Sequence, residues 1–161
     1  MKKKNKKWST RKLGYEELIK SFKDAEDTND PDFELFLNLA KEPARFTNDS
    51  IEPAREKGIE AVLVFLESIS PLASKYFFKN STYFLNIIWI FRCVDDILPG
   101  IFPKCITGKP SIRTNAMKII EKCVELDKQA IVQEKLIEGL GVSQPIKVIQ
   151  FSIECLRFII R

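Results

Sequence analysis

The sequence contains no histidine among its 161 residues. Histidine is the commonest general base and the commonest zinc ligand, and it completes every Ser-His or Cys-His nucleophile pair. Paired carboxylates such as Asp95 and Asp96 do occur, but adjacent positions of a helix point to different sides. We therefore expect no catalytic residue, no metal ligand and no cofactor, and we do not expect an enzyme.

Cysteine is scarce, and its spacing does not suit a metal site. Cys93, Cys105, Cys123 and Cys155 are separated by 12, 18 and 32 residues, so no C-x-x-C pair exists. The last three lie in apolar or helical runs, where buried reduced thiols are usual. These features favour a reducing, cytosolic compartment over a secreted one.

An apolar leader is also missing, because Met1 is followed by lysines. The net charge of +4 depends on five lysines within residues 1–7. Without them the 26 basic residues fall to 21 against 22 acidic ones, so the body is not a basic nucleic-acid-binding domain. We interpret residues 1–7 as a solvated basic tail and residues 8–161 as the domain, with no nucleic acid as partner.

No uninterrupted apolar run reaches the roughly 20 residues that a membrane span requires. The nearest is an aromatic stretch at about residues 74–92, which Lys79, Asn80, Asn86 and Arg92 interrupt. We expect no membrane partner. The stretch is either an insertion helix that packs on the domain or a segment foreign to the native coding sequence, such as a retained intron.

Helical periodicity dominates the rest, and no convincing alternating strand is present, which predicts an all-α fold. A first apolar stripe contains Tyr15, Leu18, Ile19 and Phe22, and Pro31 opens a second helix. Asp49 or Ser50 can cap a third helix, which we expect to end before Pro71. Further helices are predicted at about residues 97–106, 117–127, 131–140 and 149–160.

These helices repeat in pairs. Pro53, Pro110 and Pro145 are each followed by a basic residue and then by a helix. Each of these helices carries a small residue, an aliphatic residue and a charge in succession, beginning at Gly58, Ala116 and Ser152. The last two prolines lie 35 residues apart, a period typical of a HEAT-repeat α-solenoid, here with about four helix pairs.

A solenoid of this kind binds partners through its surface, and turns that recur once per repeat line up along one edge. The residues of interest are Trp8, residues 47–51, Lys109, Arg113 and Lys147. Trp8 is either a packing residue of the first helix or an exposed anchor, since tryptophan is enriched at interface hot spots. The three cations are either ordinary solvated charges or a basic strip for an acidic surface.

Several segments resemble the TOG domain of the multi-TOG microtubule polymerase family, and most of all its first TOG domain. Trp8-Ser9-Thr10-Arg11 resembles the W-x-x-R opening of that domain. Thr47-Asn48-Asp49-Ser50 with Lys57-Gly58-Ile59-Glu60-Ala61 resembles its second repeat, and residues 132–157 resemble its fourth. The resemblance covers roughly residues 8–70 and 94–161.

The resemblance implies a flat row of six HEAT repeats whose turn edge grips the αβ-tubulin dimer. It therefore implies a monomeric, non-enzymatic domain that acts at microtubule plus ends, in the cytoplasm and cytoskeleton, at the spindle or spindle pole. The implied tubulin-binding residues are Trp8, Thr47, Ser50, Ile51, Lys109, Arg113 and Lys147.

The sequence departs from the family pattern in places. Ser9 stands where a lysine is common, and the last two repeats of the pattern are not found, so we interpret the chain as a truncated six-repeat domain. The alternative function is a generic HEAT scaffold of the transport-receptor or phosphatase-scaffold type. Those proteins use concave helix faces, so a turn edge that carries Trp8 argues against them.

Overall fold

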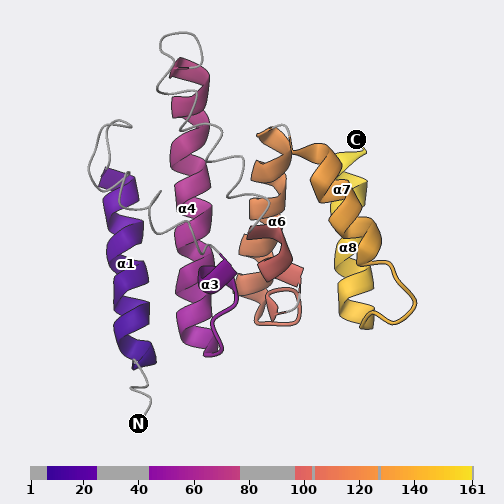
Figure 1. The fold of residues 1–161 in the computed structure, drawn as a ribbon, viewed down its shortest axis with the longest axis horizontal. Helices are drawn as coiled ribbons and strands as arrows, with labels where there is room; N and C mark the ends of the chain where they lie inside the picture. The colour runs from indigo at the N-terminus through magenta and orange to yellow at the C-terminus, as the bar shows by residue number, and fades with distance from the viewer. Residues whose placement is uncertain (1–6, 25–43, 77–96, 103, 127, 161) are drawn as a thin grey trace.

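The computed structural model describes residues 7–24, 44–76, 97–102, 104–126 and 128–160. Every regular element in these ranges is helical, so the predicted all-α fold is confirmed. The four longest of these helices stand side by side in a row (Figure 1). They are α1 (Trp8–Asp24), α4 (Glu52–Tyr76), α6 (Pro110–Glu125) and α8 (Ile146–Ile159).

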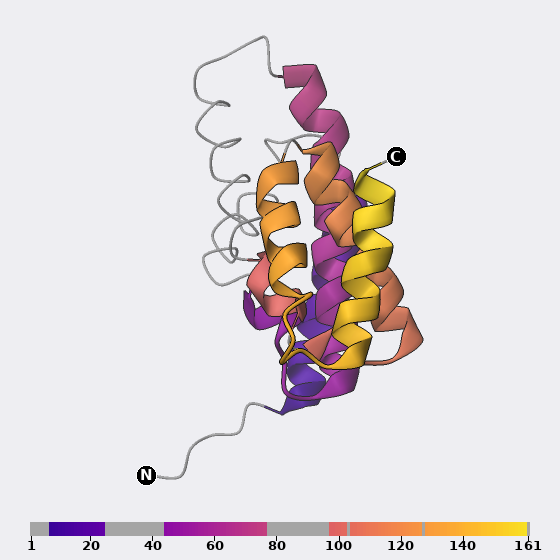
Figure 2. The ribbon, with the colours of Figure 1, turned by 90° about the vertical axis from the view of Figure 1, so that its right-hand side faces the viewer.

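Shorter helical segments form a second layer on one side of this row (Figure 2). They are α3 (Ala44–Thr47), residues 97–102 and α7 (Gln129–Glu138). Along the row α1 contacts α4, α4 contacts α6 and α6 contacts α8, while α3 packs on α4 and α7 packs on α6 and α8. α4, α6 and α8 are thus each preceded by a segment of the second layer, which is the helix-pair arrangement of a HEAT-type solenoid.

The apolar stripe predicted for the first helix is confirmed. Tyr15, Ile19 and Phe22 are buried in α1, on the side that contacts α4. The rings of Tyr15 and Phe46 meet edge to face with centroids 5.2 Å apart, and the rings of Phe22 and Phe65 lie 5.5 Å apart. Edge-to-face and offset aromatic pairs add to the area that they bury. These pairs fasten α1 to α4 and also to the second layer.

The small residue that recurs in the sequence is buried in all three helices, at Gly58, Ala116 and Ser152. At Gly58 a Cβ atom would run into the main-chain carbonyl of Phe46 in the second layer. Gly139, at the end of α7, lies close to Ser152. A Cβ atom added at Gly139 would meet the Ser152 hydroxyl. Small side chains at these positions therefore allow the two layers to approach closely.

The repeated prolines lie at helix starts, as predicted. Pro110 is the first residue of α6, Pro53 is the second residue of α4, and Pro145 directly precedes α8. Proline is tolerated there because the first N–H groups of a helix have no partner within the helix. The prolines therefore mark the points where the chain enters the row.

The predicted end of the third helix is wrong, because α4 continues through Pro71 to Tyr76. A proline inside a helix removes one hydrogen bond and disturbs one turn, at a cost of about 3 kcal/mol. That local cost does not end α4, because residues 61–66 of the same helix are continuously buried and anchor it. Outside the described residues lie the helix expected after Pro31, most of the basic tail, and the aromatic stretch beyond residue 76.

Candidate protein-binding edge

The turns that lead into the helices of the row lie along one edge of the molecule. Trp8 begins α1, and residues 48–51, 105–109 and 139–145 precede α4, α6 and α8. In Figure 1 the starts of all four helices are at the lower end of the row. The prediction that recurring turns form one edge is therefore confirmed. We call this set of turns, together with Trp8, the turn edge.

Trp8 lies at the start of the turn edge and is 46% exposed. It is the first residue of α1, and the turn that contains it is closed by a 3.0 Å hydrogen bond from the Thr10 N–H to the Lys7 carbonyl. The indole is therefore not a core residue of this chain, in contrast to the buried stripe of the same helix. A large apolar side chain is available for contact at this end of the edge.

The second turn presents some of its predicted residues and buries another. Ser50 is exposed, and Ile51 is 39% exposed. The expectation that Thr47 contributes to the same surface is wrong for this chain, because Thr47 is fully buried. Its main-chain carbonyl accepts a 3.1 Å hydrogen bond from the buried Cys105 thiol, so Thr47 packs inward at the end of α3.

Asp49 links the second turn to α1. The Arg11 guanidinium donates from Nε to Oδ2 at 2.7 Å and from Nη2 to Oδ1 at 2.9 Å, and the Ile51 N–H donates to Oδ1 at 2.9 Å. Burial opposes ionisation of Asp49, but the hydrogen bonds from Arg11 and Ile51 and the charges of Arg11 and Arg55 together lower its pKa. Asp49 is therefore a charged residue held in a largely buried site, with its carboxylate just before the start of α4.

The predicted basic strip is partly neutralised by carboxylates of the chain itself. Lys109 lies 3.5 Å from Glu52 and 3.6 Å from Glu56, both in the first turns of α4. The Ser111 hydroxyl also donates to Glu56 at 2.6 Å. The hydrogen bond from Ser111, opposed by burial and assisted by Lys109, lowers the pKa of Glu56. Lys109 therefore ties the third turn to the second helix pair and is only in part available to a partner.

Arg113 makes a similar link in the other direction along the row. Its Nη2 donates to Glu154 of α8 at 2.7 Å, and its guanidinium lies 5.8 Å from the centre of the Phe151 ring. Lys147 differs, because it is exposed and makes no ion pair with any residue in the described ranges. Of the three predicted cations, Lys147 is the one whose charge is not already compensated.

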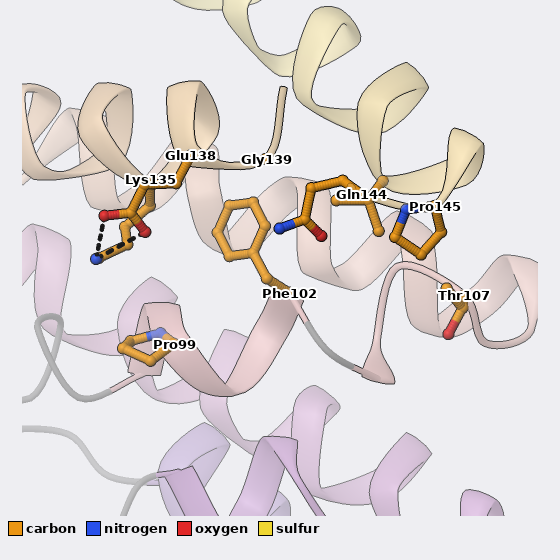
Figure 3. Close-up of a pocket in the computed structure, with 9 residues that line it drawn as sticks. Pro99, Phe102, Thr107, Lys135, Glu138, Gly139, Gln144 and Pro145 are labelled. Carbon is orange, nitrogen blue, oxygen red and sulfur yellow. Dashed lines mark hydrogen bonds and ion pairs between the residues drawn. The ribbon is translucent and has the colours of Figure 1, made fainter. Parts of the chain in front are cut away.

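A pocket of about 360 Å³ lies between residues 97–107 on one side and α7, the turn of residues 139–145 and the start of α8 on the other (Figure 3). Its walls are mostly apolar, and the ion pair between Lys135 and Glu138 lies at one side. It is lined by Pro99, Phe102, Thr107, Lys135, Glu138, Gly139, Gln144, Pro145 and Val148. No pair of a nucleophile and a base faces it, since its ionisable groups are the lysine and glutamate already joined.

Cys105, Cys123 and Cys155 are buried and form no disulfide, as predicted, while Cys93 lies outside the described ranges. Burial raises the pKa of Cys105 and of Cys155 to about 12, so neither is a reactive thiolate. No cluster of three potential metal-ligating side chains occurs in these ranges, and none of their helices meets the length and apolarity of a membrane span.

The chain matches the family described as "XMAP215/Dis1/CLASP, TOG domain" over residues 1–161. The chain belongs to the TOG-domain family. The resemblance found in the sequence is thereby confirmed at the level of the family.

Two relatives of this TOG-family chain come from a fly and a yeast. It is 32% identical to Protein mini spindles of Drosophila melanogaster over 142 residues, which are 88% of this chain and 6% of the fly protein. It is 28% identical to Spindle pole body component alp14 of Schizosaccharomyces pombe over 150 residues, which are 92% of this chain and 16% of the yeast protein. The chain thus spans a small part of either relative. No solved structure matches it.

The structure shows which contact the arginine of the W-x-x-R motif makes. This arginine, Arg11, is the residue that binds Asp49, a pairing that the sequence analysis did not predict although it quoted both residues. Lys104 was missed as well, and its ammonium donates to the Asn48 carbonyl at 3.1 Å. Asp49 carried a signal in the sequence, since a carboxylate before a helix start is a common cap, whereas Lys104 carried none.

Proposed function

We propose that this TOG-family chain binds αβ-tubulin through its turn edge, as a non-catalytic module of a larger microtubule-associated protein. The family match supports this proposal, and so do the names of the relatives, which refer to spindles and to a spindle pole body. The sequence resemblance to the first TOG domain of microtubule polymerases supports the more specific role of promoting microtubule growth.

The observation that carries the proposal is the exposure of Trp8 at the start of the turn edge. Tryptophan is enriched at interface hot spots because it buries a large area and loses little conformational freedom. The 46% exposed indole shares the edge with the 39% exposed Ile51. Two apolar side chains, with Lys147 farther along, suit a partner surface that combines an apolar patch with acidic groups.

The mechanism that follows is capture of free, curved αβ-tubulin by the turn edge of a single chain. The larger protein would deliver the captured dimer to microtubule plus ends, in the cytoplasm and at the spindle or its poles. Neither nucleic acid nor a membrane is required, and the chain acts as a monomer. The mechanism also needs no catalytic group, because binding energy alone holds the dimer.

Size-exclusion chromatography of the chain with unpolymerised tubulin at low salt tests the proposal. We expect the two to co-elute, and we expect Trp8→Ala to weaken the complex by about 2 kcal/mol, or roughly thirtyfold. The thermal midpoint should hardly change, because the indole is already half exposed. A matched control is Phe158→Ala, which removes a 50% exposed aromatic side chain near the opposite end of α8.

Three outcomes would contradict this proposal. Absence of co-elution for the unaltered chain would favour a HEAT scaffold for another protein. A large fall in thermal midpoint for Trp8→Ala, with tubulin binding by the remaining folded protein unchanged, would show that Trp8 is a packing residue. Equal losses of binding for Trp8→Ala and Phe158→Ala would place the contact away from the turn edge.

A further inference from the structure

The turn that leads into α4 is held through its main chain. Three consecutive carbonyl groups each accept a hydrogen bond from a different side chain, and the donors come from two helix pairs. The bonds join Cys105 Sγ to the Thr47 carbonyl at 3.1 Å, Lys104 Nζ to the Asn48 carbonyl at 3.1 Å, and Arg55 Nη1 to the Asp49 carbonyl at 2.7 Å. Side-chain donors thus fix the main chain of a turn that has no regular structure of its own.

The Asp49 carboxylate adds a link to α1. Arg11 binds both of its oxygens, at 2.7 and 2.9 Å, and Oδ1 also accepts the Ile51 N–H at 2.9 Å. The Asp49 side chain is only 4% exposed, so its carboxylate is sheltered from water, while the Arg11 side chain is 33% exposed. A two-point contact between a guanidinium and a carboxylate fixes orientation as well as distance.

Two exposed apolar residues of the turn edge, Trp8 and Ile51, lie on either side of this link. Trp8 precedes Arg11 by three residues in α1, so both lie on neighbouring turns of one face. Ile51 follows Asp49 by two residues, and its own N–H is bound to the carboxylate. A single buried carboxylate therefore joins the segment that carries Trp8 to the turn that carries Ile51, in addition to the packing of α1 on α4.

We propose that Asp49 is a positioning residue of the turn edge, which together with Arg11 holds Trp8 and Ile51 in one arrangement before any partner arrives. The identity of the partner rests on the proposed function, whereas the arrangement is a property of the free chain. Asp49 is buried and acts through its neighbours. A surface that is ordered in advance loses less conformational freedom when it binds, and so binds more tightly.

Amide hydrogen exchange in the free chain tests the arrangement. Asp49→Asn keeps the size of the side chain and an oxygen for the Ile51 N–H, but it removes the charge that Arg11 binds. We expect exchange of the Ile51 amide to become about tenfold faster or more, because hydrogen bonds to charged groups are the stronger ones. Amides in the middle of α6 should keep their rates.

Two further variants make this measurement decisive. Glu60→Gln is the matched control, since it breaks a 2.7 Å ion pair with Lys57 elsewhere on α4 and should leave the Ile51 amide unchanged. Arg11→Lys keeps the positive charge but loses the two-point contact, and it serves if Asp49→Asn does not fold. We expect Arg11→Lys to accelerate exchange at Ile51 as well. Unchanged exchange at Ile51 in both Asp49→Asn and Arg11→Lys overturns the proposal.

A double-mutant cycle tests the consequence for binding. In the unaltered chain, Trp8→Ala and Ile51→Ala should be coupled by about twofold or more in tubulin affinity, as expected for residues that act as a unit. In the Asp49→Asn background the two effects should become independent, and Ile51→Ala should cost less than before.

The outcomes separate this proposal from the proposed function. Faster exchange at Ile51 with unchanged coupling and affinity would show that the link has no role in binding, and would overturn the proposal. If the unaltered chain does not bind tubulin, the proposed function fails, while the exchange measurement still decides whether Asp49 orders the turn edge.

Discussion

Asp49 remains charged in a largely buried position because the donors around it outweigh the cost of removing it from water. Desolvation alone would favour the neutral acid. The hydrogen bonds from Arg11 and the Ile51 N–H, with the charges of Arg11 and Arg55, reverse that preference and lower the pKa of Asp49. The same contacts that order the turn edge therefore make its order depend on pH.

We expect the stability of the chain to fall in acid through this carboxylate. The pKa of Asp49 is lower in the folded chain than the value of about 3.9 of an unfolded aspartate, so the unfolded chain binds more protons near that pH. The stabilisation is fully present above about pH 4 and is lost as the pH falls through the folded pKa. Thermal unfolding of the unaltered chain between about pH 6 and pH 2.5 measures the decline.

Asp49→Asn is the comparison for that measurement, because it removes the titrating group. Its stability should be lower at neutral pH and should decline less steeply in acid. Glu56, whose pKa is also lowered by its bond to Ser111, contributes to the remaining decline in both chains. Parallel curves for the two chains would show that Asp49 does not contribute in the way described.

Single residues were predictable from the sequence to different degrees. Trp8 was identifiable as a candidate because tryptophan is enriched at interface hot spots, but the sequence left a packing role open until the structure showed the residue 46% exposed. The pairing of Lys109 was not predictable, because its partners Glu52 and Glu56 are distant in the sequence and meet it only after the helix pairs stack. Thr47 was predicted as a surface residue from its place in a turn, but α3 extends to it and buries it.

Within the helices, the distance between the two layers determines whether a glycine can be replaced by a larger residue without loss of stability. Gly58 faces the main chain of Phe46, whereas Gly14 in α1 has no atom within 4 Å of the place where a Cβ would lie. Both are helical, so alanine at either position gains up to about 1 kcal/mol of helix propensity. Only at Gly58 does the added atom meet a backbone that must shift.

We therefore expect opposite effects from the same substitution at these two positions. Gly14→Ala should raise the free energy of unfolding by up to about 1 kcal/mol. Gly58→Ala should lower it, because overpacking typically costs about 1–3 kcal/mol and exceeds the gain in propensity. Urea unfolding of both variants gives the comparison. A Gly58→Ala chain as stable as Gly14→Ala would mean that α3 moves away without cost.

The elements were largely predictable because their signals are local. Apolar stripes gave α1, and prolines at helix starts located α4, α6 and α8. The far end of α4 could not be predicted, because a proline in the sequence does not reveal how firmly the preceding turns are anchored. The only sign in the sequence of the contact between Gly58 and α3 was the small residue that recurs in the repeats. The sequence did not indicate which segment would pack against Gly58.

At the scale of the whole molecule, the charge on the turn edge is smaller than the sequence indicates. Lys109 and Arg113 are engaged with Glu52, Glu56 and Glu154, while Lys147 is exposed and makes no ion pair in the described ranges. Attraction to an acidic partner therefore depends more on Lys147 than on the other two predicted cations.

We expect Lys147→Glu to slow association with tubulin at low salt, because charges at the rim of an interface mainly set the association rate. The difference from the unaltered chain should shrink as salt is added, since the screening length falls to about 8 Å at 0.15 M. Lys20→Glu is the matched control, because Lys20 is exposed but lies twelve residues along α1 from Trp8. Stopped-flow fluorescence gives the rates, and equal slowing by both variants would point to net charge alone.

The row of helices also determines how the chain responds to load. The principal contacts join α1 to α4, α4 to α6 and α6 to α8, so a force applied to the two ends passes through these interfaces one after another. Interfaces arranged in this way act as springs in series, and their compliances add. A small rotation at each interface can therefore sum to a visible change in the curvature of the turn edge. The bond between Arg11 and Asp49 stiffens the first of these springs, and the ion pairs of Lys109 with Glu52 and of Arg113 with Glu154 stiffen the second and the third.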